Sequence, residues 1–208
     1  MRIIAGTLKS RRLATPDFAG LRPTSDKLRE TLFNVIAPRV PDSNLLDGFA
    51  GTGALGIEAL SRGAASVTFV DEDPRAIALI GENVRRCGIA ERCVIIRGRF
   101  AEVTRRLTPA SFDLILLDPP YAASGAGRTG SPRASPGSND DSRDNERELS
   151  AVLETAAGLL RDEGLVVLEH ARRYEAPASA GPLTRTRSLV SGDSALAFYE
   201  RAPNERRD

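Results

Sequence analysis

A glycine-rich stretch, Asp47-Gly48-Phe49-Ala50-Gly51-Thr52-Gly53-Ala54-Leu55-Gly56, decides the fold class of this chain. It follows the apolar pair Leu45-Leu46 and leads into a helical pattern over about 54–60. Glycines at such a strand-to-helix turn permit positive φ and let the backbone approach a ligand without a Cβ collision. The stretch is therefore typical of the first crossover in a doubly wound α/β sheet.

Outward from this stretch, short apolar runs alternate with helical patterns. Strands are predicted near 45–46, 66–70, 94–96, 112–117 and 165–168. The run 112–117 is continuously apolar after Asp113, which is typical of a strand buried on both faces. The alternation predicts a mostly parallel, Rossmann-like sheet with right-handed crossovers. Two last apolar runs around the turn 191–193 predict a C-terminal antiparallel hairpin.

Length and composition predict one α/β domain with small additions. The chain has 208 residues, of which 41% are hydrophobic and 27% charged. We expect a basic β-hairpin appendage over 1–22, the main domain over 23–200 and a frayed tail over 201–208. Segment 122–147 has five serines, four glycines and no Val, Ile, Leu, Met or Phe. It cannot bury much apolar surface, so we expect a disordered insertion there.

Several classes of protein are excluded by what the sequence lacks. It has no run of 18 apolar residues and no secretory signal at its start. Two cysteines and one histidine disfavour a disulfide scaffold and metal chemistry. We therefore expect a cytoplasmic protein without a metal and without a membrane partner, and we expect a monomer.

The positive charge is uneven along the chain. Lys9 and Lys27 are the only lysines, so 27 of the 29 basic residues are arginines. Residues 1–16 contain Arg2, Lys9, Arg11 and Arg12 and no acid. Arginine forks bind phosphate, which favours a nucleic-acid partner. Taken alone, however, the charge fits a solvated surface better.

Two carboxylates flank the predicted crossover and indicate the ligand. Asp71 ends the run 66–70, 20 residues after Gly51, where it could accept hydrogen bonds from both ribose hydroxyls of an adenosine cofactor. The spacing Gly51-x-Gly53-x-x-Gly56 also matches the dinucleotide fingerprint. Asp47 would repel a pyrophosphate and attract an ammonium group, which favours S-adenosylmethionine over NAD.

A second motif, Asp118-Pro119-Pro120-Tyr121, directly follows the run 112–117. Two prolines remove two N–H donors, so the loop presents mainly acceptors. Acceptors suit an exocyclic amine, whose lone pair they localise and direct. Tyr121 could stack on a flipped or unpaired base.

These motifs together resemble a known family. Asp47 to Gly53 followed by Asp118 to Tyr121 looks like a class I S-adenosylmethionine-dependent N-methyltransferase. The stretches 2–6, 11–13, 21–34, 53–63 and 192–193, above all Arg22-Pro23-Thr24-Ser25-Asp26-Lys27 and its continuation to Asn34, resemble the RsmD family. The resemblance implies methylation of a guanine N2 amine in 16S ribosomal RNA, within the small subunit or an assembly intermediate.

The resemblance also distributes roles among residues. It implies that Asp118, Pro119, Pro120 and Tyr121 hold the guanine amine, and that the N-terminal hairpin faces RNA. The predicted cofactor site comprises Asp47, Phe49, Ala50, Gly51, Gly53, Asp71, Glu72, Arg99 and Phe100. The predicted RNA-binding residues are Arg2, Lys9, Arg11, Arg12 and Arg22.

One position departs from the family pattern. Related enzymes often carry Asp or Asn after the third strand to accept from the adenine amine, and here Arg99 stands near that place. Arginine cannot accept a hydrogen bond. The Phe100 N–H and apolar contacts are the alternative means of holding adenine.

Three other functions fit parts of the pattern. An adenine-N6 methyltransferase acting on DNA or RNA could use the same tetrapeptide. An NAD-dependent dehydrogenase would use the glycine spacing alone. An RNA-binding assembly factor without catalysis would need only the basic arm.

Overall fold

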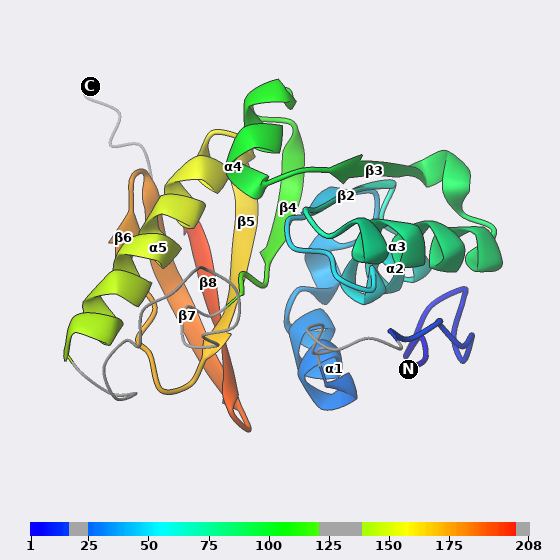
Figure 1. Cartoon of the computed structure of the whole chain (residues 1–208), viewed down its shortest axis with the longest axis horizontal. Helices are drawn as coiled ribbons and strands as arrows, with labels where there is room; N and C mark the ends of the chain where they lie inside the picture. Colours follow the sequence, from blue (N-terminus) through cyan, green and yellow to red (C-terminus); the bar gives the residue numbers. More distant parts are fainter. Residues whose placement is uncertain (17–24, 121–138, 203–208) are drawn as a thin grey trace.

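The computed structural model describes residues 1–16, 25–120 and 139–202. Its described strands form one sheet in the order β3-β2-β1-β4-β5-β8-β7-β6 (Figure 1). The strands are β1 (Asn44–Asp47), β2 (Ser66–Asp71), β3 (Cys93–Arg97), β4 (Phe112–Leu117), β5 (Leu160–Ala171), β6 (Ser179–Ala180), β7 (Leu183–Ser191) and β8 (Ser194–Arg201).

Strand directions confirm the predicted mixed sheet. Strands β1 to β5 are parallel, whereas β8 pairs antiparallel with β5 and β7 pairs antiparallel with β8. The predicted C-terminal hairpin is therefore confirmed. The strand order reverses between β1 and β4, and ligands of doubly wound sheets bind beyond the carboxyl ends of the strands at such a switch point.

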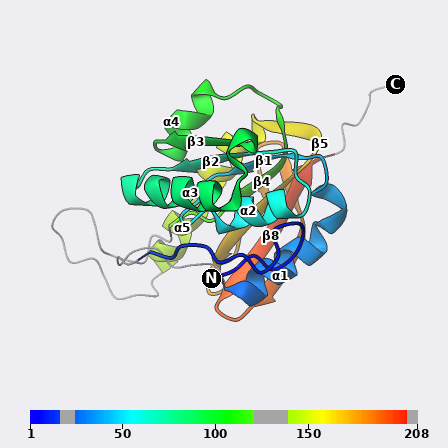
Figure 2. The same cartoon turned by 90° about the vertical axis from the view of Figure 1, so that its right-hand side faces the viewer.

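Helices cover both faces of the sheet (Figure 2). They are α1 (Asp26–Val35), α2 (Ala54–Ser61), α3 (Pro74–Cys87), α4 (Phe100–Val103) and α5 (Asn139–Ala157), with short 3₁₀ turns at Ala37–Arg39, Ala90–Arg92 and Thr104–Arg106. Successive strand residues point to opposite faces. Leu45 accordingly packs with α1, α2 and α3, while Leu46 packs with α4 and α5.

The sequence Thr24-Ser25-Asp26 predicts a helix start with Thr24 or Ser25 as its cap, and helix α1 begins at Asp26. The Ser25 side chain caps it by accepting a hydrogen bond from the Leu28 N–H at 3.1 Å. Asp26 lies in the first turn, near the positive end of the helix dipole. Leu28, Leu32 and Phe33 are buried against the sheet.

The N-terminal segment differs from the predicted strand pair. Within 1–16, one isolated antiparallel bridge joins Arg2 to Arg12. Ile3, Leu8 and Leu13 are buried in the same core as α1 and α2. Backbone hydrogen bonds flank the bridge, from the Ile3 N–H to the Arg11 carbonyl at 3.0 Å and from the Leu13 N–H to the Met1 carbonyl at 3.2 Å. Hydrophobic burial therefore adds to this short pairing in holding the segment, which we call the N-terminal arm (residues 1–16). Residues 17–22 of the predicted appendage lie outside the described residues.

Helix α5 begins at Asn139 and so includes 139–147, the last part of the segment for which we expect a disordered insertion. Asn145 is buried one helical turn before Leu149, and Leu153 and Ala156 continue the same buried stripe. Packing of that stripe thus extends the helix into a polar segment. The rest of the insertion, up to 138, and the tail 203–208 lie outside the described residues.

In the described ranges, no helix is both long and apolar enough to cross a membrane.

Candidate functional site

Three acidic residues predicted for the site come at the carboxyl ends of neighbouring strands. Asp47 ends β1, Asp71 ends β2, and Asp118 directly follows β4. Since β1 lies between β2 and β4, these ends meet at one edge of the sheet. The fold therefore brings together two motifs that are 71 residues apart, as the positions Asp47 and Asp118 show.

The glycine loop crosses this edge and is tied to the strands on both sides of β1. The Gly48 N–H donates to the Leu116 carbonyl at 2.9 Å, and the Ala50 N–H donates to the Val70 carbonyl at 3.0 Å. A Cβ at Gly48 would lie 2.7 Å from both the Leu117 Cδ2 and the Phe100 Cε2 atoms. Only glycine fits there without moving these side chains.

Asp71 binds the loop directly. Its Oδ2 accepts from the Gly51 N–H at 2.8 Å, and its Oδ1 accepts from the Asp73 N–H at 2.9 Å. A carboxylate oxygen has two lone pairs, so each oxygen can accept a second hydrogen bond. Asp71 can therefore hold the loop and still accept from ribose hydroxyls.

Asp47 is a buried carboxylate with a raised pKa. The residue is 2% exposed, and its Oδ2 accepts from the Gly56 N–H at 3.0 Å. Burial raises the pKa of Asp47 to about 7, the Gly56 hydrogen bond lowers it, and the charge of Asp71 raises it again. Because burial disfavours the charged form of Asp47, a nearby cation would stabilise that form strongly. This environment suits the ammonium group that is predicted to lie here.

Two aromatic rings stand beside the loop. The Phe49 and Phe100 ring centroids are 5.2 Å apart. Phe100 is buried and opens α4, directly after Arg99. Their pairing brings apolar surface to the end of β1, and a contact of these rings with an adenine stays a prediction.

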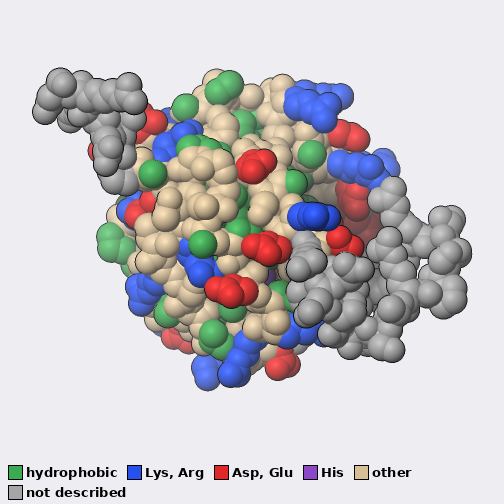
Figure 3. All heavy atoms as spheres, turned by 90° about the vertical axis from the view of Figure 1, so that its left-hand side faces the viewer, with side chains coloured by type: hydrophobic (Ala, Val, Ile, Leu, Met, Phe, Trp, Pro, Cys, Tyr) green, Lys and Arg blue, Asp and Glu red, His purple; other side chains and the backbone are tan. Residues whose placement is uncertain are grey.

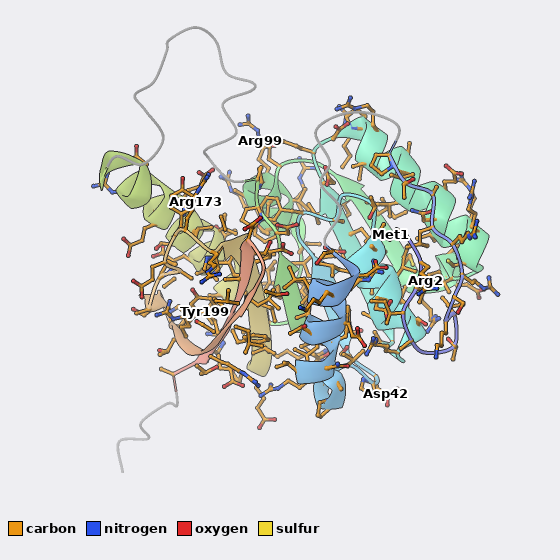
Figure 4. All side chains as sticks on the ribbon, turned by 90° about the horizontal axis from the view of Figure 1, so that it is seen from below. Met1, Arg2, Asp42, Arg99, Arg173 and Tyr199 are labelled. Atoms are coloured by element: carbon orange, nitrogen blue, oxygen red, sulfur yellow. The ribbon has the colours of Figure 1, made fainter. Side chains whose placement is uncertain are left out.

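Arg99 and Glu72 form an exposed ion pair, with 3.5 Å between Arg99 Nε and Glu72 Oε2. Figure 4 shows Arg99 pointing outward at the edge of the molecule. The pairing places both predicted residues near the ends of β2 and β3. Because the pair is solvated, its contribution to stability is small.

The acceptor loop after β4 is partly described. Asp118 is half-buried, Pro119 is buried and Pro120 is exposed. Asp118 is engaged in an interaction within the protein. Tyr121 lies outside the described residues.

The basic residues of the N-terminal arm divide into two kinds. Arg2, Lys9 and Arg12 are exposed. Arg11 is also exposed, but it donates from Nη1 to the Arg86 and Cys87 carbonyls, each at 3.2 Å. Its guanidinium therefore stabilises the C-terminus of α3, where a cation is favoured. Arg22 lies outside the described residues.

The structure also brings residues to the arm that the sequence analysis did not single out. Arg85 and Arg86, exposed in the last turn of α3, lie near Arg11. Asn83, on the same helix, is buried and bonds to the arm. Asn83 interrupts the apolar stripe of Ile80, Val84 and Cys87, and a polar residue on such a stripe is the signal that could have revealed it.

The start of the arm is held by a buried acid on α2. Glu58 accepts from the Ile4 N–H at 2.8 Å and the Ala5 N–H at 3.0 Å, and it pairs with Arg62. Arg29 lies with its Nε 3.9 Å from the same carboxylate and donates to the Arg2 carbonyl. Met1 and Arg2 accordingly lie beside α2 in Figure 4.

The opposite side of the molecule has a different charge pattern. On the face that α5 and β6 to β8 form, basic and acidic side chains are intermixed (Figure 3).

In the described part of the chain, no group of three or more His, Cys, Asp or Glu side chains is arranged to hold a metal ion.

The fold, with its β3-β2-β1-β4-β5 parallel strands and C-terminal antiparallel hairpin, is that of the Rossmann-like methyltransferases. The chain is similar to the solved structure of the Escherichia coli protein yhhF, with a TM-score of 0.74, 32% identity and 97% coverage of each chain. It also shares its fold with an RNA methyltransferase of Salinibacter ruber, solved with S-adenosyl-L-homocysteine, at a TM-score of 0.61, 14% identity and coverage of 90% and 98%.

Sequence relatives identify the family. The model of the family described as Conserved hypothetical protein 95 matches residues 1–129. Ribosomal RNA small subunit methyltransferase D of Escherichia coli is 32% identical over 97% of this chain and 90% of its own length. The protein of the same name from Haemophilus influenzae is 40% identical over 58% and 64%. The chain belongs to this family, the RsmD family.

Proposed function

We propose that this protein transfers a methyl group from S-adenosylmethionine to the N2 amine of a guanine in 16S ribosomal RNA. One observation carries the proposal: the Asp47–Asp71 cradle and the Asp118-Pro119-Pro120 acceptors lie at adjoining strand ends. Membership of the RsmD family supports methyl transfer to RNA and decides against the dehydrogenase alternative.

The residues of the cradle fit the cofactor. Asp47 is buried with a pKa near neutrality and favours a cation, and Asp71 keeps lone pairs for two hydroxyls. Gly51 and Gly53 have φ of 52° and 76°, a left-handed backbone conformation that glycine adopts readily, and it lets the loop turn sharply from β1 into α2. Phe49 and Phe100 offer an apolar wall beside it.

When bound, the cofactor supplies an electrophilic methyl group on a sulfonium. Asp118 and the carbonyls around Pro119 accept hydrogen bonds from the two N–H donors of the guanine amine. This holds the nitrogen lone pair away from the purine ring and in line with the methyl group. Asp118 stabilises the positive charge that develops on nitrogen and takes the released proton, directly or through water. Tyr121 is proposed to stack on the guanine.

The N-terminal arm supplies the RNA contacts. Arg2, Lys9 and Arg12 are exposed on it, and Arg85 and Arg86 extend the positive surface along α3. Arginines bind phosphate bidentately, so this surface fits the backbone of folded RNA. We propose that the protein acts as a monomer on the small subunit or an assembly intermediate in the cytoplasm.

The test uses labelled S-adenosylmethionine and small ribosomal subunits from cells that lack the enzyme. Label should appear in 16S RNA as N2-methylguanine, identified by nucleoside mass spectrometry. Labelled N6-methyladenine would instead establish the adenine alternative. No transfer to RNA, or equal transfer by Asp118→Ala, would refute the proposal.

A further inference from the structure

Asn83 on α3 connects the N-terminal arm to the glycine loop. Its Oδ1 accepts from the Ala14 N–H at 2.7 Å, and its Nδ2 donates to the Ala14 carbonyl at 3.2 Å. The same Nδ2 donates to the Thr52 carbonyl at 3.0 Å. One side chain thus joins two segments that are 38 residues apart, as the positions of Ala14 and Thr52 show.

The environment of Asn83 makes this connection strong. The side chain is 0% exposed, so water does not compete for its hydrogen bonds. Both amide hydrogens are used, and burying an amide without partners would cost about 1–3 kcal/mol. A shift of Ala14 or of Thr52 therefore disturbs the hydrogen bonds of the other.

The two ends of this connection are the two proposed ligand sites. Thr52 lies between Gly51 and Gly53, both at positive φ, in the loop that would hold the cofactor. Ala14 follows Arg11, Arg12 and Leu13 in the arm. Figure 2 shows the arm running beside α3, which carries Asn83, and beside α2, which directly follows the loop.

We propose that Asn83 is a positioning residue that couples cofactor binding at the glycine loop to RNA binding by the N-terminal arm. The inference rests on the proposed function, because it takes RNA as the ligand of the arm. Cofactor binding fixes Thr52, and through Asn83 this fixes Ala14, the point two residues after Arg12 at which the arm is tied to α3. The RNA then binds an arm that is already ordered, so each ligand strengthens the other reciprocally.

The experiment measures both affinities in both states. The dissociation constant of S-adenosylhomocysteine is determined with and without undermethylated small subunits, and that of the subunits with and without saturating S-adenosylhomocysteine. The wild-type protein should show the same factor in both directions, about 5-fold or more, the lower end of typical coupling. Asn83→Ala and Asn83→Asp should bring the factor close to 1. In Asn83→Asp, Oδ1 still accepts from Ala14, but a second oxygen faces the Thr52 carbonyl.

A matched control variant removes another asparagine side chain that connects two segments of the chain by a hydrogen bond. Asn44 Oδ1 accepts from Ser66 Oγ at 2.8 Å, at the amino ends of β1 and β2 and away from the site. Asn44→Ala should keep the wild-type coupling factor. A loss of coupling in Asn44→Ala equal to that in Asn83→Ala would overturn the assignment to Asn83.

A measurement on the wild-type protein keeps the inference testable if the Asn83 variants do not fold. Hydrogen exchange of the Ala14 amide should slow when S-adenosylhomocysteine binds, because its acceptor becomes better ordered. Unchanged exchange, or a wild-type coupling factor of 1, overturns the inference while leaving the proposed function intact. Failure of the wild-type protein to bind either ligand would overturn both.

Discussion

The Asp71 carboxylate accepts a hydrogen bond from the Gly51 N–H at 2.8 Å, across the sheet edge between β2 and the glycine loop. The residue expected to bind ribose therefore also shapes the loop that holds the rest of the cofactor. This double role means that a change at Asp71 affects folding and binding together.

Asp71→Ala should lower both stability and cofactor affinity. The Gly51 and Asp73 N–H groups lose their acceptor, which costs about 1–3 kcal/mol of the free energy of unfolding. The dissociation constant of S-adenosylhomocysteine should rise about tenfold or more, as expected for loss of hydrogen bonds to a charged acceptor. Thermal unfolding and calorimetry measure the two effects.

Asp73→Ala is the control for this comparison. Asp73 caps α3 by accepting from the Arg75 N–H at 2.8 Å, and losing a cap costs about 1 kcal/mol. Stability should fall while S-adenosylhomocysteine affinity stays at the wild-type value. If Asp73→Ala weakened S-adenosylhomocysteine binding as much as Asp71→Ala does, the loss of affinity in Asp71→Ala would be due to lower stability. A direct contact between Asp71 and the cofactor would then be contradicted.

Cofactor affinity should rise with pH around neutrality. In the free protein the pKa of Asp47 is about 7, so the carboxyl is largely protonated below that pH and cannot pair with an ammonium group. Binding then requires loss of a proton, and affinity should fall by up to about tenfold for each pH unit below the pKa. Calorimetry of S-adenosylhomocysteine between about pH 6 and 8 tests this, and Asp47→Asn should bind weakly with a flat profile.

The stability of the free protein should respond to pH with the opposite sign. Asp47 has a pKa of about 7 when folded against 3.8 for the ordinary group, so the folded state binds more protons between these values. Its contribution to stability is complete below pH 3.8 and is lost as pH rises through about 7. Relative to Asp47→Asn, the wild-type melting temperature should fall across that range. A constant difference would contradict the raised pKa.

Asp118→Ala should reduce turnover without loss of cofactor binding. Removing a positioned proton acceptor typically slows catalysis about 10²–10⁴-fold. The S-adenosylhomocysteine dissociation constant should stay within a factor of about two, because Asp118 follows β4 and the cradle lies on β1 and β2. Asp113→Ala, at the other end of β4, should retain turnover.

Arg11 and Arg12 are neighbours with different expected effects. Arg12 is exposed and is expected to contact one phosphate. Arg12→Ala should therefore reduce the slope of the log binding constant for RNA against log salt concentration by about 1. Arg11 donates to two carbonyls at the end of α3, so Arg11→Ala should lower the free energy of unfolding by about 0.3–1 kcal/mol. Equal salt slopes for Arg12→Ala and the wild-type protein would contradict an RNA contact at Arg12.

The sequence by itself determined the elements and the chemistry of the strand ends. Alternating apolar runs predict parallel strands, because only a strand buried on both faces is continuously apolar as 112–117 is. Asp47, Asp71 and Asp118 are recognisable because each follows such a run directly. Local patterns also predict a helix cap at Thr24 or Ser25, of which the structure shows Ser25, and the C-terminal hairpin, since both depend on residues close in the chain.

Only the tertiary structure decided the partners of buried polar groups. Three such contacts join residues that are distant in sequence. Asp71 anchors Gly51, and Arg11 binds the end of α3. Asn83 connects Ala14 to Thr52. The raised pKa of Asp47 likewise follows from burial, which neighbouring residues do not reveal. The same holds for α5, whose early start at Asn139 includes Asn145 packed on the stripe of Leu149 and Leu153. Periodicity shows which face of an element is buried, whereas the groups it meets there depend on how the whole chain packs.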